Sequence, residues 1–193
     1  YKLTLFDLDY TLLPLDSDHA WGEFTSALGW TDAREFKRRN DAFYAQYQAG
    51  TLDIHDYVRF ATAAVRRHGA QAAQQAQACF MREVIEPAVM PAAQALLDAH
   101  QRAGDAVVIV TATNEFVTRP IATRLGVPEL IAVQLARGAD GWITGEIEGV
   151  PSFREGKVER VAQWLGARGL NWGDTEITFY SDSMNDLPLL ERA

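Results

Sequence analysis

The stretch Leu3-Thr4-Leu5-Phe6-Asp7-Leu8-Asp9-Tyr10-Thr11 decides the fold of this chain. It is a short, mainly apolar run that ends in two carboxylates one residue apart, and such a run predicts a buried strand of a parallel sheet. Asp7 would lie at the carboxyl end of this strand, and ligands bind at that edge of open α/β sheets. The stretch alone would also fit an aspartate-rich turn that leaves a strand.

Two later stretches repeat this design. One apolar run over 107–110 leads into Thr111, and another over 177–180 leads into Ser181 and Asp182. If the three runs are parallel neighbours, the polar residues that follow them meet at one edge of the sheet. The sequence therefore predicts a site at this edge, built from Asp7, Asp9, Thr111, Asp182, Asn185 and Asp186.

The rest of the chain separates into a helical part and an alternating part. Helical periodicity between the first strand and Pro91 predicts a small bundle, and strand and helix patterns alternate from there on. We therefore predict a doubly wound, Rossmann-like α/β fold with a parallel sheet. Residues 1–14 and 88–193 would form the core, and residues 15–87 would form a helical-bundle cap inserted after strand one.

Capping and helix-breaking residues predict the boundaries. We expect Ser17 to cap the first helix, one helix to run from Asp53 to near Gly69, and Pro87 to end the fourth helix. In the core we expect a helix from about Thr118 to Leu125. A turn over 138–141 predicts a hairpin whose returning strand ends near residue 147.

Composition excludes several classes of protein. The net charge of −8 argues against a nucleic-acid partner, and no apolar run approaches the roughly 20 residues that span a bilayer. The single cysteine, Cys79, cannot form an internal disulfide and is interpreted as a packing residue. We expect a cytoplasmic monomer or homodimer, trimmed at both ends from a longer chain, that binds neither nucleic acid nor membrane.

The polar motifs resemble those of the haloacid dehalogenase superfamily. The four motifs are Asp7 to Thr11, Thr111 at the end of an apolar strand, Gly156-Lys157, and Asp182 with Asn185-Asp186. The segment 15–86 resembles the helical cap of the phosphoserine-phosphatase-like branch (subfamily IB), so that the resemblance spans essentially the whole chain. It implies a Mg²⁺-dependent phosphatase that acts through an aspartyl-phosphate.

The paired acids suit the hydrolysis of a phosphomonoester. Asp7 is the first polar side chain after the strand and could act as the nucleophile, while Asp9 could protonate the leaving oxygen and then deprotonate water. Oxygen ligands of this kind suit Mg²⁺. By resemblance, the metal ligands would be the Asp7 carboxylate, the Asp9 backbone carbonyl and the Asp182 carboxylate.

Four further residues are candidates for binding the phosphate group, and a fifth is a candidate for supporting the site by hydrogen bonding. The Thr111 hydroxyl and the N–H of Ala112 could hold phosphate oxygens, although Thr111 could also simply end its strand. Lys157 lies in the first turn of a helix, where a cation is disfavoured unless an anion is near, or it could be a solvated surface lysine. The resemblance implies that Asn185 orients phosphate and that Asp186 supports the site, and Asp186 could equally be a helix cap.

Substrate choice would depend on the cap. By resemblance, Asp16 would contact a substrate amine and Arg59 a substrate carboxylate. The acidic segment 16–19 would instead suit a cationic substrate without a carboxylate, so phosphoserine and histidinol phosphate both stay open. Tyr10 departs from the family pattern, which has a small or asparagine-like residue there, and it could narrow the entrance.

Two other functions remain as alternatives. A phosphoacceptor signalling domain also uses acids at strand ends, and a phosphotransferase or mutase could use the same fold, because fold alone does not assign chemistry. A catalytically inactive binding module is disfavoured because every expected catalytic position is filled. The histidines His55, His68 and His100 have no partner visible in the sequence and are interpreted as surface or packing residues.

Overall fold

The computed structural model describes all residues, 1–193, and contains the expected parallel sheet. Its strands are β1 (Lys2–Phe6), β2 (Ala106–Asn114), β3 (Leu130–Val133) and β6 (Glu176–Tyr180), in the order β3-β2-β1-β6. All neighbouring strands are parallel, and β1 pairs with both β2 and β6. The strand that ends in Asp7 therefore lies inside the sheet, with the polar ends of β2 and β6 on either side.

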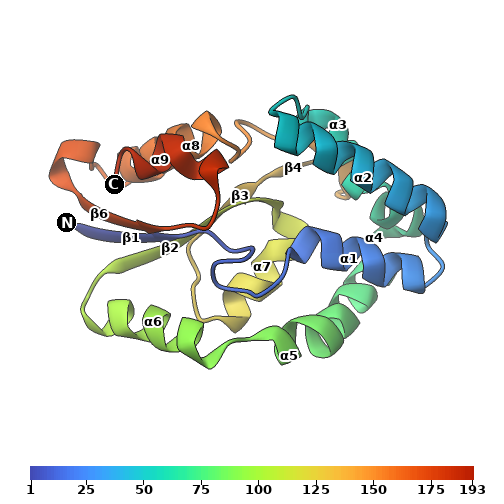
Figure 1. Cartoon of the computed structure of the whole chain (residues 1–193), viewed down its shortest axis with the longest axis horizontal. Coiled ribbons are helices and arrows are strands. Elements are labelled where there is room, and N and C mark those ends of the chain that lie inside the picture. The colour runs from blue at the N-terminus through green and yellow to red at the C-terminus, as the bar shows by residue number, and fades with distance from the viewer.

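Helices cover both faces of this sheet (Figure 1), which confirms the doubly wound α/β fold. The core helices are α6 (Pro91–Arg102), α7 (Glu115–Arg124), α8 (Glu155–Gly166) and α9 (Leu187–Leu190), with short 3₁₀ turns at Trp172–Asp174 and Met184–Asp186. Alternate residues of β1 point to opposite faces: Leu3 and Leu5 pack with Leu165 of α8, whereas Phe6 packs with the α6 and α7 side.

The predicted cap is helical. Its elements are α1 (Ser17–Ala27), α2 (Ala33–Ala49), α3 (Ile54–Ala61), α4 (Ala63–Phe80), a π-helical turn over Met81–Ile85, and α5 (Glu86–Ala88). Helices α1 to α4 gather beside the sheet on the side away from the two termini (Figure 1). None of the helices combines the length and apolar character that crossing a bilayer requires.

The predicted helix boundaries in the cap are partly wrong. Asp16, not Ser17, caps α1, because its side chain accepts hydrogen bonds from the N–H groups of residues 18 and 19. The helix expected from Asp53 to near Gly69 is divided at Thr62 into α3 and α4, but the chain does leave the helical conformation at Gly69, whose φ is +84°. Pro87 lies in the last helical segment, which ends one residue later at Ala88.

Helix α7 begins at Glu115, three residues before the predicted start at Thr118. The Asn114 side chain caps it by accepting a hydrogen bond from the Val117 N–H (3.2 Å). Pro120 lies inside this helix and cannot donate to the Phe116 carbonyl four residues earlier. The Gln77 side-chain amide of α4 donates to that carbonyl instead, so the cap satisfies a group that the core helix leaves unpaired.

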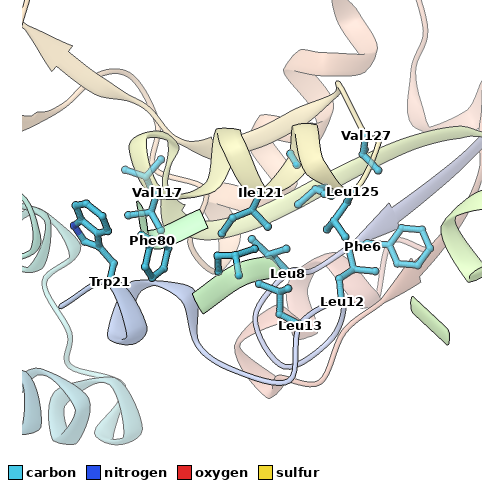
Figure 2. Close-up of a cluster of buried hydrophobic side chains, with 14 of the residues drawn as sticks. Phe6, Leu8, Leu12, Leu13, Trp21, Phe80, Val117, Ile121, Leu125 and Val127 are labelled. Atoms are coloured by element: carbon cyan, nitrogen blue, oxygen red, sulfur yellow. The ribbon is translucent and has the colours of Figure 1, made fainter. Parts of the chain in front are cut away.

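One hydrophobic cluster runs through the core and the cap. Figure 2 shows Trp21 of α1 and Phe80 of α4 at one end of the cluster, and Ile121 and Leu125 of α7 further along toward Phe6 of β1. The rings of Trp21 and Phe80 meet edge to face with centroids 5.2 Å apart. The cap therefore shares its apolar interior with the face of the sheet that α6 and α7 cover.

The predicted hairpin is confirmed and supports the cap. Strands β4 (Leu135–Arg137) and β5 (Ile143–Ile147) pair antiparallel, and Gly141 in the connecting turn has a φ of +78°. The Trp142 indole N–H at the start of β5 donates to the Val65 carbonyl of α4 (3.1 Å). The hairpin thus attaches α4 to the core by a contact separate from the hydrophobic cluster.

Two histidines have partners that the sequence did not reveal. The His100 ring bonds to Asp105 (2.7 Å) through Nδ1 and to the Tyr180 hydroxyl (3.0 Å) through Nε2, which links α6 to β6. His68 stacks on Trp30 with ring centroids 4.1 Å apart. Cys79 is half-buried in α4.

Candidate active site

Asp7 directly follows β1 and is buried at the carboxyl edge of the sheet. Its N–H donates to the Tyr180 carbonyl of β6 (2.9 Å), which continues the ladder and fixes the backbone at this position. Its Oδ1 accepts a hydrogen bond from the Lys157 ammonium (3.1 Å). Burial raises the pKa of Asp7 to about 6, although the charge of Lys157 opposes this rise.

Lys157 is 2% exposed, so the interpretation of it as a solvated surface lysine is wrong. Its three donors reach the carboxylates of Asp7 (3.1 Å) and Asp186 (2.7 Å) and the Val110 carbonyl (3.2 Å). Burial lowers the pKa of Lys157, but the two carboxylates outweigh it and hold the pKa above its ordinary value. The site therefore keeps a fixed cation beside Asp7.

The start of α8 positions this lysine through a close backbone approach. A Cβ atom on Gly156 would lie 1.9 Å from the Pro151 carbonyl oxygen, so that only glycine fits there. Arg154, the N-cap of the helix, has a backbone φ of +53°, a value that residues other than glycine rarely adopt. The chain thus enters α8 through a tight and strained turn immediately before Lys157.

Asp9 is held by two donors and is half-buried. Its carboxylate accepts hydrogen bonds from the Ser17 N–H (2.8 Å) and from the Thr113 hydroxyl (2.9 Å). Burial, followed by the negative charge of Asp16, raises the pKa of Asp9 to about 8. A carboxyl group that retains its proton near neutral pH can donate it, as a general acid must. Sequence reasoning missed Thr113, which the period of two in β2 places on the same face as Thr111.

The phosphate candidates lie around the same edge. The Thr111 side-chain oxygen accepts the Thr113 N–H (3.1 Å), which leaves its hydroxyl hydrogen free to donate, and half-buried Ala112 follows it. Asn185 accepts a hydrogen bond from the Arg154 guanidinium through Oδ1 (3.2 Å), and its amide NH₂ donates to the Ser183 hydroxyl (3.4 Å), which leaves its second N–H without a partner in the protein. Asp186 is buried against Lys157 and also accepts from the Ser181 hydroxyl (2.7 Å).

The carboxylates near Asp7 offer hard oxygen ligands for a cation. Asp182 is exposed, and within the protein its carboxylate is approached only by the Thr11 hydroxyl, at 3.5 Å. The Asp9 carboxylate is already engaged by two donors, and no group of three or more acid, histidine or cysteine side chains is close enough to hold a metal. A cation would therefore need the carboxylates of Asp7 and Asp182 together with a backbone carbonyl, a donor set that suits Mg²⁺.

Tyr10 lies at the entrance of the site. Its φ is +56° in a tight turn in which the N–H groups of residues 11 to 13 all donate to the Leu8 carbonyl. Glycine and asparagine adopt this backbone region more readily than tyrosine does, so Tyr10 holds a less favourable backbone conformation here. The Tyr10 ring is 61% exposed and lines the opening.

A cavity of about 610 Å³ lies between the sheet edge and the cap, a volume suited to a small ligand. All the core candidates line it. The cap contributes three carboxylates, one histidine, one asparagine and six apolar or aromatic side chains, namely Asp16, Asp18, Asp41, His19, Asn40, Phe43, Tyr44, Tyr47, Leu52, Ile54 and Tyr57. No lysine or arginine of the cap lines the cavity.

Of the two cap residues expected to bind the substrate, only one lines the cavity. Asp16 lines the cavity, although one of its oxygens already caps α1. Arg59 does not line it: its guanidinium pairs with Glu146 of β5 (2.8 Å) and with Asp56 (2.9 Å). Helical periodicity places Arg59 on α3 but does not tell which face of α3 turns toward the cavity. The role expected for Arg59 is therefore not supported.

Two contacts join the cap to the phosphate side of the cavity. The Arg154 guanidinium, which bonds to Asn185, also donates to the Gly50 carbonyl at the end of α2 (3.1 Å). The Tyr47 hydroxyl of α2 bonds to the Ser183 hydroxyl beside the Met184–Asp186 turn (3.2 Å). The end of α2 thus rests on the loop that carries Asp182 and Asn185.

Comparison with known proteins agrees with this fold. A family model of haloacid dehalogenase-like hydrolases matches residues 4–191. The histidinol-phosphatase of Neisseria meningitidis serogroup C (strain 8013) is 42% identical to the chain, with 98% of this chain and 86% of that protein aligned. These matches cover nearly the whole chain.

Solved structures agree as well. A protein of unknown function from Bordetella pertussis Tohama I is 47% identical, with a TM-score of 0.91 over 98% of this chain and 86% of that one. A phosphoserine phosphatase, solved as a phospho-aspartyl intermediate analogue, has a TM-score of 0.66 over 100% of this chain and 83% of that one. At 21% identity this second likeness concerns the fold alone.

The fold and the site define a hydrolase with a strand-end aspartate at its centre. The chain belongs to the haloacid dehalogenase-like hydrolase family, because the family model spans almost its whole length. With its phosphoserine-phosphatase-like architecture, it is a phosphatase.

Proposed function

We propose that this phosphatase hydrolyses a small cationic phosphomonoester without a carboxylate group, with histidinol phosphate as the best candidate. The observation that carries this proposal is the cap wall of the cavity, which has three carboxylates and no lysine or arginine. A substrate ammonium group matches such a wall, whereas the carboxylate of phosphoserine would find no cap cation, because the arginine and lysine that line the cavity, Arg154 and Lys157, lie on its phosphate side beside Asn185 and Asp7. The 42% identity to a curated histidinol-phosphatase supports the same substrate.

In the proposed reaction, Asp7 is the nucleophile. One of its carboxylate oxygens attacks phosphorus, the bond from phosphorus to the ester oxygen breaks, and an aspartyl-phosphate forms. Lys157 beside Asp7 balances the negative charge of the phosphoryl group, because its ammonium is buried and cannot turn away to solvent.

Asp9 serves as the acid and then as the base. It gives its proton to the departing alcohol oxygen and afterwards takes one from the water that attacks the aspartyl-phosphate. The raised pKa of Asp9 supports the first step, and the hydrogen bonds from Ser17 and Thr113 hold the carboxyl group in place. The reaction thus ends with free phosphate, and both aspartates return to their starting forms.

The phosphate oxygens would be held by neutral donors around Lys157. The free hydroxyl hydrogen of Thr111, the N–H of Ala112 and the amide NH₂ of Asn185 are the candidates. Mg²⁺ would be held by the Asp7 and Asp182 carboxylates and the Asp9 carbonyl, and when bound it supplies positive charge that offsets repulsion between the acids and the phosphate.

A panel of phosphomonoesters tests this function. Phosphate release is measured for histidinol phosphate, phosphoserine and phosphoethanolamine, each with Mg²⁺ and with a chelator. We expect metal-dependent release, with kcat/KM highest for histidinol phosphate and at least about tenfold lower for phosphoserine, since a carboxylate without a partner costs binding energy. Asp7→Asn should abolish turnover without loss of fold.

The contrary outcomes are distinct. Preferred hydrolysis of phosphoserine would reject the substrate assignment but keep the chemistry. Substantial turnover by the Asp7→Asn variant would reject the aspartyl-phosphate mechanism. Transfer of phosphate to an added alcohol in place of water would favour a phosphotransferase.

A further inference from the structure

We propose that Asp18, held in place by Tyr57, is the residue that binds the substrate's ammonium group and selects for it. This inference rests on the proposed function and adds a specificity-determining residue that sequence reasoning did not single out.

Asp18 lines the cavity from α1 and is 8% exposed. The Tyr57 hydroxyl of α3 donates to its Oδ2 at 2.6 Å, whereas its Oδ1 accepts no hydrogen bond from the protein. It forms no ion pair, and the adjacent His19 bonds to Glu23 instead (2.8 Å). The cavity wall therefore carries a buried carboxylate that lacks a cation. Burying a charge costs desolvation free energy, and a cationic ligand would offset that cost.

The two other carboxylates of the cap wall are already compensated. Asp16 accepts two backbone N–H groups (3.0 Å each) as the N-cap of α1, where the helix dipole favours a negative charge. Asp41 is exposed and pairs with Lys37 (2.6 Å). Asp18 alone among the three combines burial, a fixed orientation and an oxygen without a partner.

The walls next to Asp18 suit an aromatic cation. Tyr57 reaches the carboxylate with its hydroxyl, and its ring stacks with Phe60 and meets Phe43 edge to face (centroids 5.5 Å apart), so that its position is fixed by packing. Phe43 also lines the cavity. A substrate with both an ammonium group and a planar ring would meet a carboxylate and aromatic faces on the same wall.

The test compares two esters that differ only in the amine. Histidinol phosphate is measured against the phosphate ester of 3-(imidazol-4-yl)propan-1-ol, which lacks the amino group. We expect the Asp18→Asn variant to lose about 10- to 100-fold in kcat/KM for histidinol phosphate and less than about threefold for the amine-free ester, because only the first loses a charged partner. Tyr57→Phe should reduce kcat/KM for histidinol phosphate by a smaller factor, and this variant too should affect the amine-free ester less.

Asp56→Asn is the matched control, because Asp56 is an exposed carboxylate of the cap that pairs with Arg59 (2.9 Å) and lies outside the cavity lining. It should change kcat/KM for neither ester by more than about threefold. Thermal unfolding gives a second readout. If Asp18 had a purely structural role, the Asp18→Asn variant would melt at a lower temperature and would lose kcat/KM equally for both esters. That result would overturn the inference.

Two kinetic outcomes separate this inference from the proposed function. A preference for the amine-bearing ester that survives in Asp18→Asn would overturn the role of Asp18 alone. A wild-type enzyme that does not prefer the amine-bearing ester would overturn both.

Discussion

At the scale of single residues, the site contains three carboxyl groups that the fold largely removes from water. Asp7, Asp9 and Asp18 all have pKa values raised chiefly by burial. Such a group binds its proton more tightly in the folded than in the unfolded chain, so stability falls as pH rises between the two pKa values. The site thus lowers the stability of the protein near neutral pH, where Asp7 is mostly ionised and Asp9 still holds its proton.

Asp18 gives a direct measure of this cost. Burial, followed by the charge of Asp16, raises its pKa to about 7, while the Tyr57 hydrogen bond and His19 lower it. Because an unfolded aspartate titrates near 3.9, Asp18→Asn should be more stable than the wild type at pH 8, by an amount on the order of 2–4 kcal/mol. At pH 5, where Asp18 is mostly protonated in the fold, the difference should shrink to about 1.5 kcal/mol or less.

Urea unfolding at the two pH values measures this difference. Asp41→Asn provides the control and should change stability by no more than about 0.5 kcal/mol at either pH. A loss of stability in Asp18→Asn at pH 8 would contradict the account of a costly buried charge.

At the scale of elements, the entry into α8 decides where the catalytic cation lies. Gly156 packs against the Pro151 carbonyl oxygen, a backbone atom that cannot move without moving the turn. We expect Gly156→Ala to destabilise the protein by about 1–3 kcal/mol and to reduce kcat more than tenfold, because the helix that carries Lys157 must shift. Thermal unfolding and steady-state kinetics measure the two effects.

The same helix offers a matched control. A Cβ on Gly166, at the other end of α8, would meet no atom within 4 Å, and its backbone φ is not positive. Gly166→Ala should therefore leave kcat unchanged and stabilise the protein by up to about 1 kcal/mol. Equal behaviour of the two variants would mean that the close approach at Gly156 does not position Lys157.

At the scale of the whole molecule, the cap and the core share one hydrophobic cluster. The division into a core (1–14 and 88–193) and a cap (15–87) remains our proposal for the moving parts, with the cavity between them. Phe80 is 1% exposed in the shared cluster. We expect Phe80→Ala to cost about 3–5 kcal/mol and to leave a single unfolding transition, because the two parts lose the same core.

Calorimetry and circular dichroism test this cooperativity. Leu96→Ala on α6 is the control, since Leu96 is 37% exposed and lies outside the shared cluster, and it should cost no more than about 1.5 kcal/mol. Separate melting of the cap in either variant would contradict a shared core and would support two units that fold independently.

What the sequence by itself determined was the sheet, its helical layers and the residues at the strand ends. Apolar runs such as 3–6 and 107–110 specify strands locally, and parallel strands bring their carboxyl ends to one edge, so Asp7, Thr111 and Asp182 were predictable neighbours. Helix boundaries were less predictable, because the apolar periodicity continues through Thr62 and does not show that the helix divides there.

Only the tertiary structure decided which side of each cap helix meets the cavity. Periodicity identifies residues that share a helix face, but the packing of one helix on another sets where that face points. Packing turned Arg59 toward Glu146 and away from the cavity. It buried Asp18 beside Tyr57, 39 positions away in the chain, because the hydrophobic cluster under the cap fixes the rotation of α1 and α3.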